Sequence, residues 1–278
     1  MASWVADIGG SSSRWARLVP EGAGGAVEVL PGFNPVSGDP SALVAAMGRL
    51  RDDHPGTVRE LHIHGAGCGS PEGAGRMYEV MRSAWPGTQV HVGTDLLGAA
   101  RALHGDHPGL VLVLGTGMSC GHYDGRSIRK AMPSLGWILG DEGSGADLGK
   151  RMVTDGLAGR LSKELSQVLF PEGLERGNVL QQVYRSAAPQ AYLAAFAKRL
   201  AEPGAAAYAE ALLADRFTEL ALSVLAAFPE AASTGVKASG SIAWAFRPLL
   251  QAAFGRQGLS LTEVVRDPLP GLLRWHSR

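Results

Sequence analysis

Short apolar runs that end in glycine or hydroxyl residues recur along this chain and alternate with segments of helical periodicity. Residues 4–8 and 110–114 are apolar runs, and each leads through a polar turn into a return run. This pattern predicts two β-hairpins. The other strands are expected at 14–19, 27–30, 61–64, 89–92, 120–123 and 236–239, and the helices at 41–54, 72–84 and 94–103 and from Ser144 onward. Strands and helices that alternate in this way indicate an α/β fold.

Residues 153–228 read as a series of helices with Ala and Leu faces. Proline and glycine interrupt them at 170–173 and 203–204, and this region is expected to supply packing rather than chemistry. A length of 278 residues is enough for two domains, each with its own core. The strand–turn–strand unit at 4–19 recurs at 110–123, which suits such a division.

Composition excludes several classes of partner. Lys plus Arg and Asp plus Glu each number 26, so the basic excess typical of nucleic-acid or anionic-membrane binding is missing. The two cysteines, Cys68 and Cys120, suit a reducing cytosol better than a disulfide scaffold. The first residues lack a secretory signal pattern, and no apolar run approaches the roughly 20 residues of a membrane span. We therefore expect a cytoplasmic protein that binds neither membrane nor nucleic acid.

The turn after the first strand has the chemistry of a phosphate site. Gly9, Gly10 and Ser11 offer amide and hydroxyl donors that can surround phosphate oxygens. Asp7, at the end of the strand, is well placed to hold Mg²⁺ through water. A hairpin with a polar tip explains the same residues and is the commoner reason for such a turn. The Gly-Thr-Gly turn at 115–117 occupies the same place in the second hairpin.

The segment 135–150 combines glycines with adjacent carboxylates. Asp141 and Glu142 stand between Gly140 and Gly143, where a ligand can approach the backbone closely. Unpaired carboxylates are not buried, so these two are expected to face a ligand. The spacing of Ser144 and the Asp three residues later predicts a capping box at the start of a helix. A surface turn that leads into a helix is the alternative.

Three further positions leave alternatives open. Asn34, before Pro35, is either turn chemistry or a donor and acceptor for a sugar. Asp95, at a strand–helix junction, is either an N-cap or a carboxylate facing the crevice where α/β proteins bind ligands. His62 and His64 share one face of a strand, which could suggest a metal. Since no other ligands are near them in sequence, packing or hydrogen-bonded histidines are favoured.

The string Gly-Asp-Glu-Gly-Ser-Gly at 140–145 resembles the signature of the N-acetylglucosamine kinase and BadF-type ATPase family of the hexokinase–actin superfamily. The first Gly/Ser turn, Gly-x-Asn-Pro at 32–35, Asp-x-x-Gly-Ala at 95–99 and Gly-Thr-Gly at 115–117 match the family in order, so the resemblance covers nearly the whole chain. It implies an α/β, two-domain hexokinase–actin (ribonuclease H-like) fold, with duplicated mixed β-sheet domains around a nucleotide cleft. The expected domains are 1–106 and 107–265, with a C-terminal helix at 266–278 packed on the first.

The resemblance also implies a function. The expected activity is an ATP-dependent, Mg²⁺-requiring kinase that acts on the 6-hydroxyl of N-acetylglucosamine or N-acetylmuramic acid, as a homodimer. Asp95 matches the catalytic base and Asp7 the metal-linked aspartate. The implied ATP and phosphate ligands are Gly9, Gly10, Ser11, Ser13, Gly115, Thr116, Gly117, Ser119, Ser239, Gly240 and Ser241. The implied sugar ligands are Asn34, Asp95, Thr116, Gly136, Asp141 and Glu142.

The chain departs from the family pattern at both phosphate turns. Relatives often carry Thr-Lys-Thr at 11–13, where this chain has three serines, so two hydroxyls are kept and the charge at Ser12 is lost. Relatives usually carry Ser at 118, where this chain has Met118, and Ser119 then offers the nearest hydroxyl. These changes put the detailed phosphate contacts in doubt.

Two other functions compete with the kinase. An ATPase that activates a dehydratase or reductase would need Cys68 or Cys120 as ligands to a bridging iron–sulfur cluster. A sugar sensor without catalysis would not need the intact Asp7, Asp95 and Gly-Asp-Glu-Gly residues. The sequence therefore favours the kinase.

Overall fold

A computed structural model describes residues 2–18 and 26–278. The described residues form two five-stranded sheets. The chain divides into two compact units: unit 1 comprises Met1–Pro108, Tyr123–Arg129 and Asp267–Arg278, and unit 2 comprises Gly109–His122 and Lys130–Arg266. The short return of 123–129 to unit 1 is a feature that the division expected from the sequence does not contain.

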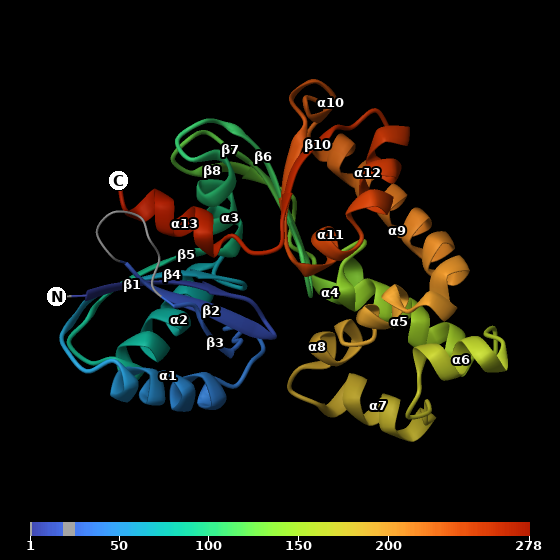
Figure 1. Ribbon diagram of the computed structural model, residues 1–278, viewed down its shortest axis with the longest axis horizontal. Coiled ribbons are helices and arrows are strands. Elements are labelled where there is room, and N and C mark those ends of the chain that lie inside the picture. The colour runs from blue at the N-terminus through green and yellow to red at the C-terminus, as the bar shows by residue number, and fades with distance from the viewer. Residues whose placement is uncertain (1, 19–25) are drawn as a thin grey trace. The chain divides into compact units, whose positions relative to one another are not determined.

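Unit 1 is built on a mixed sheet with the strand order β3-β2-β1-β4-β5 (Figure 1). Strands β1 and β2 form the predicted antiparallel hairpin, and β4 and β5 run parallel to β1. Its strands are β1 Ala2–Ile8, β2 Ser12–Leu18, β3 Glu28–Pro31, β4 Val58–Gly65 and β5 Gln89–Thr94, and its helices are α1 Ser41–Asp53, α2 Pro71–Ala84, α3 Asp95–His104 and α13 Leu269–His276. The predicted second strand extends to Val19, which lies outside the described residues.

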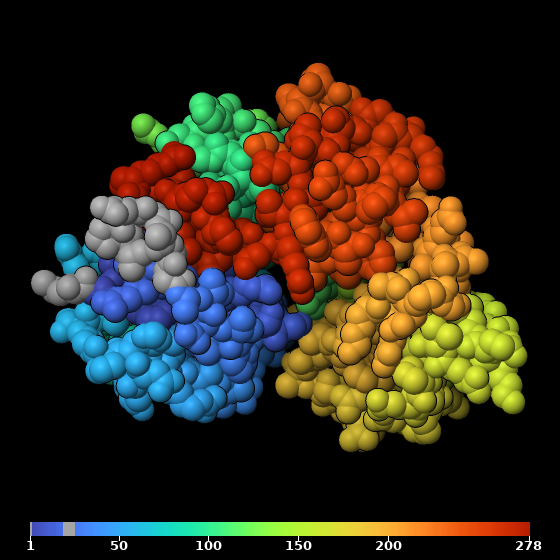
Figure 2. Space-filling view, viewed as in Figure 1, coloured from blue at the N-terminus to red at the C-terminus, as the bar shows by residue number. Residues whose placement is uncertain are grey.

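Alternation along β1 decides which helices cover each face of this sheet. Trp4, Ala6 and Ile8 pack into a core with buried residues of α1 and α2. Val5 points to the opposite face, into a smaller cluster with Leu269 and other residues of α13. This is the two-residue period of a strand that is buried on both sides. Figure 1 shows α1 and α2 on one face and α3 and α13 on the other, and Figure 2 shows the dark-red C-terminal atoms beside blue atoms of the first strands.

Unit 2 repeats this sheet. The second sheet has the order β10-β9-β6-β7-β8, which matches β5-β4-β1-β2-β3 strand for strand. Its strands are β6 Gly109–Leu114, β7 Met118–Tyr123, β8 Ile128–Ala131, β9 Val236–Ser239 and β10 Leu261–Val265. The predicted duplication of a mixed sheet is confirmed, and with it the two-domain α/β fold of the hexokinase–actin type.

The helices of unit 2 supply most of its core. They are α4 Gly136–Leu139, α5 Gly145–Leu157, α6 Lys163–Leu169, α7 Arg176–Arg185, α8 Pro189–Ala194, α9 Ala206–Ala227, α10 Ala231–Thr234, α11 Ser241–Ala245 and α12 Arg247–Arg256, with 3₁₀ turns η1 Ala197–Ala201 and η2 Pro203–Ala205. Leu110, Leu112 and Leu114 of β6 belong to one core with Phe217 of α9 and Leu148 of α5. No helix in the described part of the chain is long and apolar enough to cross a membrane.

Candidate active site

The first polar turn, at 9–11, connects β1 to β2 in unit 1. The Gly9 amide donates to the Ser12 carbonyl at 3.0 Å, and the Phe33 amide donates to the Gly9 carbonyl at 3.0 Å. A Cβ on Gly32 would lie 2.4 Å from the Gly9 carbonyl oxygen. The loop after β3 therefore packs directly against the turn, and only glycine fits at position 32.

The serines of this hairpin have different surroundings. Ser11, at the tip, is exposed, whereas Ser13 is buried. The Ser13 hydroxyl donates to the Pro31 carbonyl and accepts from the Trp15 indole, both at 2.8 Å. This geometry argues against the expected phosphate contact of Ser13, because its hydroxyl holds the hairpin together. The phosphate roles of Gly10 and Ser11 stay predictions, and the Gly9 amide is already engaged by the Ser12 carbonyl.

Two carboxylates act on a third, Asp7, at this edge of unit 1. Burial raises the pKa of Asp7 to about 8, and repulsion from Asp95 and Asp267 adds to the rise, while the Arg14 guanidinium opposes it. Arg14 also forms an ion pair with Asp267, with 3.1 Å between Nε and Oδ2. Sequence reasoning missed Asp267, which follows β10 at the far end of the chain. Its only local signal is an Asp directly before the Pro-rich start of the last helix.

Asp95 lies where β5 gives way to α3, but it is not the cap of that helix. Thr94 is the N-cap, and its hydroxyl accepts from the Leu97 amide at 3.0 Å. Asp95 is the first helical residue, and its carboxylate accepts from the Leu96 amide at 2.8 Å. The capping explanation of Asp95 is therefore wrong: Thr94 satisfies the amide that a cap must satisfy.

The carboxylates of unit 1 fit a magnesium ion. The charges of Asp95 and Asp267 both act on Asp7, and Arg14 is the cation that opposes them. Burial is the largest cause of the raised pKa at Asp7, and the two neighbouring negative charges favour a bound positive charge, which a proton supplies in the free protein. Mg²⁺ prefers oxygen ligands and keeps several waters, so Asp7 is the residue best suited to hold it.

Asn34 occupies the loop that supports the first turn. Its side-chain oxygen accepts from the Val36 amide at 2.9 Å, which is the turn chemistry that the sequence also allowed. A Cβ on Gly67, whose φ is +75°, would lie 2.2 Å from this oxygen, so the loop after β4 packs against Asn34. The amide NH₂ group of Asn34 is the part of the side chain suited to contact a ligand.

In unit 2 the equivalent turn, 115–117, is tied to the start of α5. The Gly115 amide donates to the Gly117 carbonyl at 3.0 Å. The amides of Gly145 and Ala146 donate to the carbonyls of Gly115 and Thr116, at 2.8 and 3.0 Å. These bonds satisfy amides at the N-terminus of α5 that would otherwise lack partners. The turn is therefore held against the start of α5 by backbone contacts.

Asp141 joins the acidic segment to this same turn. One of its oxygens accepts from the Met118 amide at 3.2 Å, and a Cβ on Gly117 would lie 3.1 Å from the other oxygen. Asp141 has a φ of +59°, a strained conformation for a residue with a side chain. Burial raises the pKa of Asp141; the Met118 amide opposes the rise and the neighbouring Glu142 adds to it. The structure thus brings Thr116 and Asp141 together.

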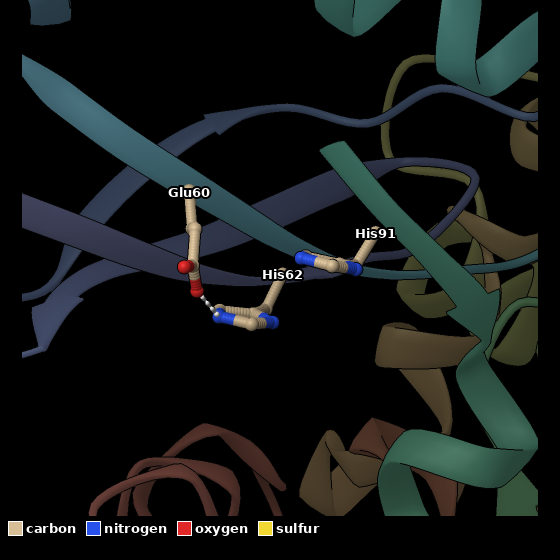
Figure 3. A group of neighbouring side chains, drawn as sticks. All are labelled: Glu60, His62 and His91. Carbon is tan, nitrogen blue, oxygen red and sulfur yellow. Dashed lines mark hydrogen bonds and ion pairs between the residues drawn. The ribbon is translucent and has the colours of Figure 1, made fainter. Parts of the chain in front are cut away.

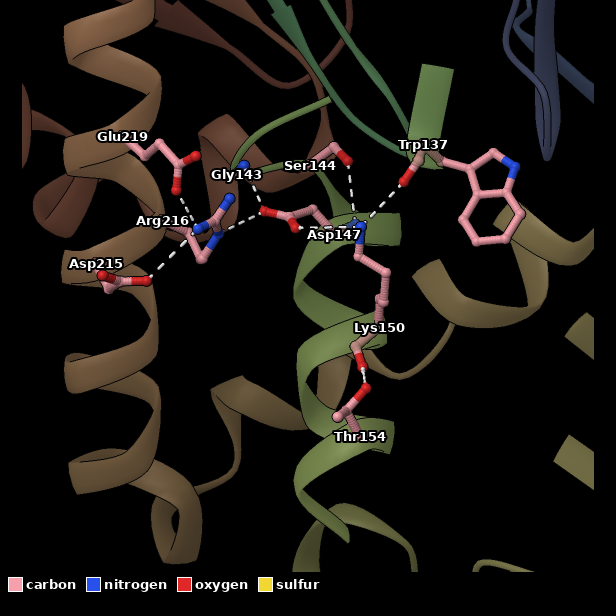
Figure 4. A network of polar contacts seen from close by, with 9 residues as sticks. All are labelled: Trp137, Gly143, Ser144, Asp147, Lys150, Thr154, Asp215, Arg216 and Glu219. Carbon is pink, nitrogen blue, oxygen red and sulfur yellow. Dashed lines mark hydrogen bonds and ion pairs between the residues drawn. The ribbon is translucent and has the colours of Figure 1, made fainter. Parts of the chain in front are cut away.

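The helix after the acidic segment is fixed by a buried ion pair (Figure 4). Ser144 is the N-cap of α5 and accepts from the Asp147 amide at 3.3 Å, which confirms the first half of the predicted capping box. The return bond differs, because Asp147 accepts from the Gly143 amide at 3.0 Å while the Ser144 amide donates to the Asp141 carbonyl. Asp147 also pairs with Arg216 of α9 at 2.7 Å, and Arg216 contacts Glu219 as well. Arg216 comes from the region expected to supply packing alone, so sequence reasoning missed it.

The other predicted ligands of unit 2 are Ser119, Gly136 and Glu142, and their exposure to solvent differs. Met118 and Cys120 of β7 are buried in the core, and Ser119 between them points to the other face of the strand, half-buried. Gly136 has a φ of +70° at the start of α4, and a Cβ there would meet nothing within 4 Å. Glu142 is half-buried. These residues keep the predicted roles as hypotheses.

The glycine turn after β9 lies against the end of β6. A Cβ on Gly240, whose φ is +122°, would come within 2.3 Å of the Leu114 carbonyl oxygen. The Gly240 amide donates to the Val265 carbonyl of β10 at 3.1 Å. Ser239 is buried, and Ser241 is exposed as the first residue of α11. The motif at 239–241 therefore adjoins the turn at 115–117, at the carboxyl ends of parallel strands where α/β proteins bind ligands.

Both cysteines are free thiols inside the protein. Cys68 belongs to unit 1 and Cys120 to unit 2, and each is buried. Burial raises the pKa of Cys68 to about 12, with a further rise from the Asp95 charge, and burial also raises the pKa of Cys120 to about 12. A metal or cluster is bound by the thiolate, so neither cysteine is prepared for ligation.

Comparison with solved structures agrees with this architecture. A proposed N-acetylglucosamine kinase from Porphyromonas gingivalis is 30% identical, with a TM-score of 0.81 and coverage of 99% of this chain and 98% of that chain. A proposed N-acetylglucosamine kinase from Chromobacterium violaceum is 23% identical, with a TM-score of 0.74 and coverage of 99% and 98%. A ROK-family glucokinase from Streptomyces griseus, solved with glucose and AMPPNP, is 16% identical, with a TM-score of 0.61 and the same coverage, and shares the fold. No protein-family model and no curated protein matches the chain.

Fold, duplicated sheets and polar turns together define a sugar kinase of the hexokinase–actin superfamily. Within that class the chain belongs to the N-acetylglucosamine kinase and BadF-type ATPase family.

Proposed function

We propose that this chain transfers the terminal phosphoryl group of ATP to the 6-hydroxyl of an N-acetylated amino sugar, N-acetylglucosamine or N-acetylmuramic acid. The position of Asp95 carries the proposal. Thr94 is the N-cap of α3, so capping does not account for the Asp95 carboxylate, which accepts from the Leu96 amide in the first turn. It stands at the carboxyl end of β5, in the same sheet whose β1 ends at the turn 9–11. A carboxylate so placed is suited to accept a proton from a substrate hydroxyl.

The other residues take roles that follow from their chemistry. Amides and the hydroxyl of the turns at 9–11 and 115–117 stabilise phosphate oxygens, and the turn at 239–241 supports the nucleotide. Asp95 orients the acceptor hydroxyl and removes its proton. Mg²⁺, held at Asp7, supplies positive charge that offsets the charge on the phosphates.

The sugar-binding role rests on Asn34 in unit 1 and on Thr116, Gly136, Asp141 and Glu142 in unit 2. The Asn34 oxygen is engaged by Val36, so its NH₂ group is the donor proposed for the acetamido carbonyl. Asp141 and Glu142 are carboxylates suited to sugar hydroxyls. A site built to bond a polar group discriminates strongly against an analogue that lacks the group.

A coupled assay of ADP release, with ATP, Mg²⁺ and a panel of sugars, tests the proposal. We expect a clear preference for N-acetylglucosamine or N-acetylmuramic acid over glucose. Asn34→Asp keeps the oxygen that the turn needs and removes the NH₂ donor, so it should reduce this preference without changing the melting temperature. Equal catalytic efficiency on glucose in the wild-type protein would contradict the assignment of the substrate.

The same assay separates the competing functions. A sensor would bind the sugar without releasing ADP, and an activating ATPase would release ADP without any amino sugar. The buried, protonated thiols of Cys68 and Cys120 count against the activator, which needs thiolate ligands for its cluster.

The proposal extends to assembly and compartment. A homodimer is implied by the family resemblance, and light scattering at assay concentration tests it. Free thiols at both cysteines suit the cytoplasm, where thiols stay reduced.

A further inference from the structure

A cluster of imidazoles lies in unit 1, on the sheet face covered by α3 and α13. The parallel register of β4 and β5 places His62 beside His91. Glu60 precedes His62 by two residues on β4, so its side chain points to the same face. His276 of α13 completes the cluster, with its ring centroid 4.4 Å from that of His62. Residues far apart in the sequence therefore meet on this face.

Three of these side chains can converge on one ion (Figure 3). The candidate ligand atoms of Glu60, His62 and His91 all lie within 4.8 Å of one another. Glu60 Oε2 and His62 Nε2 are already 3.1 Å apart. The rings of His62 and His91 are stacked at 4.9 Å, so His91 has to rotate to aim a nitrogen at a shared ion. His91 is exposed and has the freedom to do so.

The surroundings leave room for an ion and its waters. A pocket of about 350 Å³ is lined by His62, His64, His91 and His276. The candidate ligand His91 precedes Asp95 by four residues, roughly 13 Å at the rise of a strand, so it is separate from the proposed base. The donor set also differs from the oxygen ligands that Mg²⁺ prefers.

We propose that Glu60, His62 and His91 bind a divalent transition-metal ion of the zinc class. Two imidazoles and a carboxylate are the ligands that such ions take, and water fills the remaining positions. The ion would link β4 to β5 beside α13. This differs from the expectation that the strand histidines serve packing or hydrogen bonding, because the fold brings Glu60 and His91 to His62.

Calorimetric titration of zinc chloride into chelator-treated full-length protein tests the site. We expect saturable binding of a single ion per chain, and visible absorption bands of tetrahedral or five-coordinate Co²⁺ when cobalt replaces zinc. His91→Ala and Glu60→Gln should each weaken zinc binding by about 10-fold or more. His107→Ala, which removes an exposed histidine of unit 1 outside the cluster, should bind zinc like wild type.

Because His91 is exposed, His91→Ala should keep the fold, which circular dichroism and the melting temperature will verify. Absence of saturable binding in the wild-type protein would overturn the proposal. So would wild-type affinity in His91→Ala, or a loss of affinity in His107→Ala as large as that in His91→Ala. None of these readouts depends on kinase activity.

Discussion

The turns at 9–11 and 115–117 occupy equivalent places in two sheets with the same strand order, yet the residues around them differ in charge and in hydrogen bonding. The next-to-last residue of β1 is Asp7, and the corresponding residue of β6 is Val113. In unit 1 the carboxylates Asp95 and Asp267 raise the pKa of the buried Asp7, next to the turn. In unit 2 the turn is fastened by backbone hydrogen bonds to α5.

The two copies of the sheet thus differ: charged side chains lie near the turn of unit 1, and backbone hydrogen bonds hold the turn of unit 2. Unit 1 places two carboxylates close enough to raise the pKa of a third, Asp7, as a site that handles protons and cations requires. Unit 2 neutralises its most buried carboxylate, Asp147, with Arg216, and engages Asp141 with the Met118 amide. A duplicated sheet can specialise in this way because the strand ends sit at fixed places while the residues on them vary.

Among these tests of the difference between the two units, the largest effect is expected at Asp95 of unit 1. Asp95→Asn should lower turnover by about 10² to 10⁴, the usual range for a positioned general base. Asn is nearly isosteric, and Thr94 remains to cap α3, so the melting temperature should stay close to that of wild type. Steady-state kinetics and thermal melting together decide the point. A fully active variant would mean that the base lies elsewhere.

The second largest effect is expected at the buried ion pair between Asp147 and Arg216 of unit 2. Arg216→Met leaves Asp147 buried without its partner, which typically costs about 3–5 kcal/mol. Urea unfolding should show this loss. Combining Arg216→Met with Asp147→Leu removes the stranded charge and should recover most of the stability. If the single variant is as stable as wild type, the pair does not hold α9 to α5.

The raised pKa of Asp7 makes a prediction about pH. The folded protein holds this proton up to a pKa of about 8, whereas the ordinary value is 3.8. Proton binding therefore stabilises the folded state at low pH, and this contribution is lost as pH rises towards 8. Asp7→Asn has no such proton to lose. Relative to wild type it should gain more than about 1 kcal/mol of stability between pH 5 and 8.5 without Mg²⁺. A constant difference across this range would contradict the shift.

The smallest effect is expected at the cap next to the base. Thr94→Ala removes the hydroxyl that accepts from Leu97, and should cost about 1 kcal/mol of stability. Turnover should stay within a few-fold of wild type, because the Asp95 carboxylate remains. Chemical denaturation measures the cost, with Thr94→Ser as the control that keeps the cap. A large loss of turnover in Thr94→Ala would show that the cap at Thr94 and the proposed base at Asp95 do not act independently.

The sequence predicts the fold well because the signals are local. Apolar runs that end in glycine mark the strand ends at Ile8 and Leu114, and the Ser144 capping box is read from adjacent residues. Capping at α3 is not decided by sequence, since Thr94 and Asp95 are both good N-caps. Burial of the Ser13 hydroxyl cannot be predicted from the local sequence either, because it depends on Trp15 and on the separate strand that ends at Pro31.

Contacts between distant segments are what sequence reasoning could not supply. In the sequence, Arg216 is one of several polar residues in a mainly apolar helix, and only the structure shows that it pairs with Asp147. Asp267 meets Arg14 only because α13 returns to the first sheet. His91 joins His62 through strand register, which a single sequence does not reveal.

The return of α13 to unit 1 also sets the order in which the protein can be assembled during translation. Nascent domains generally fold as they emerge, the N-terminal one first. Here Asp267 and the helix that covers Val5 are synthesised only after Lys130–Arg266. All of unit 2 is therefore made before unit 1 can close over β1, and Asp7 acquires its final surroundings late although it lies in the first strand of its sheet.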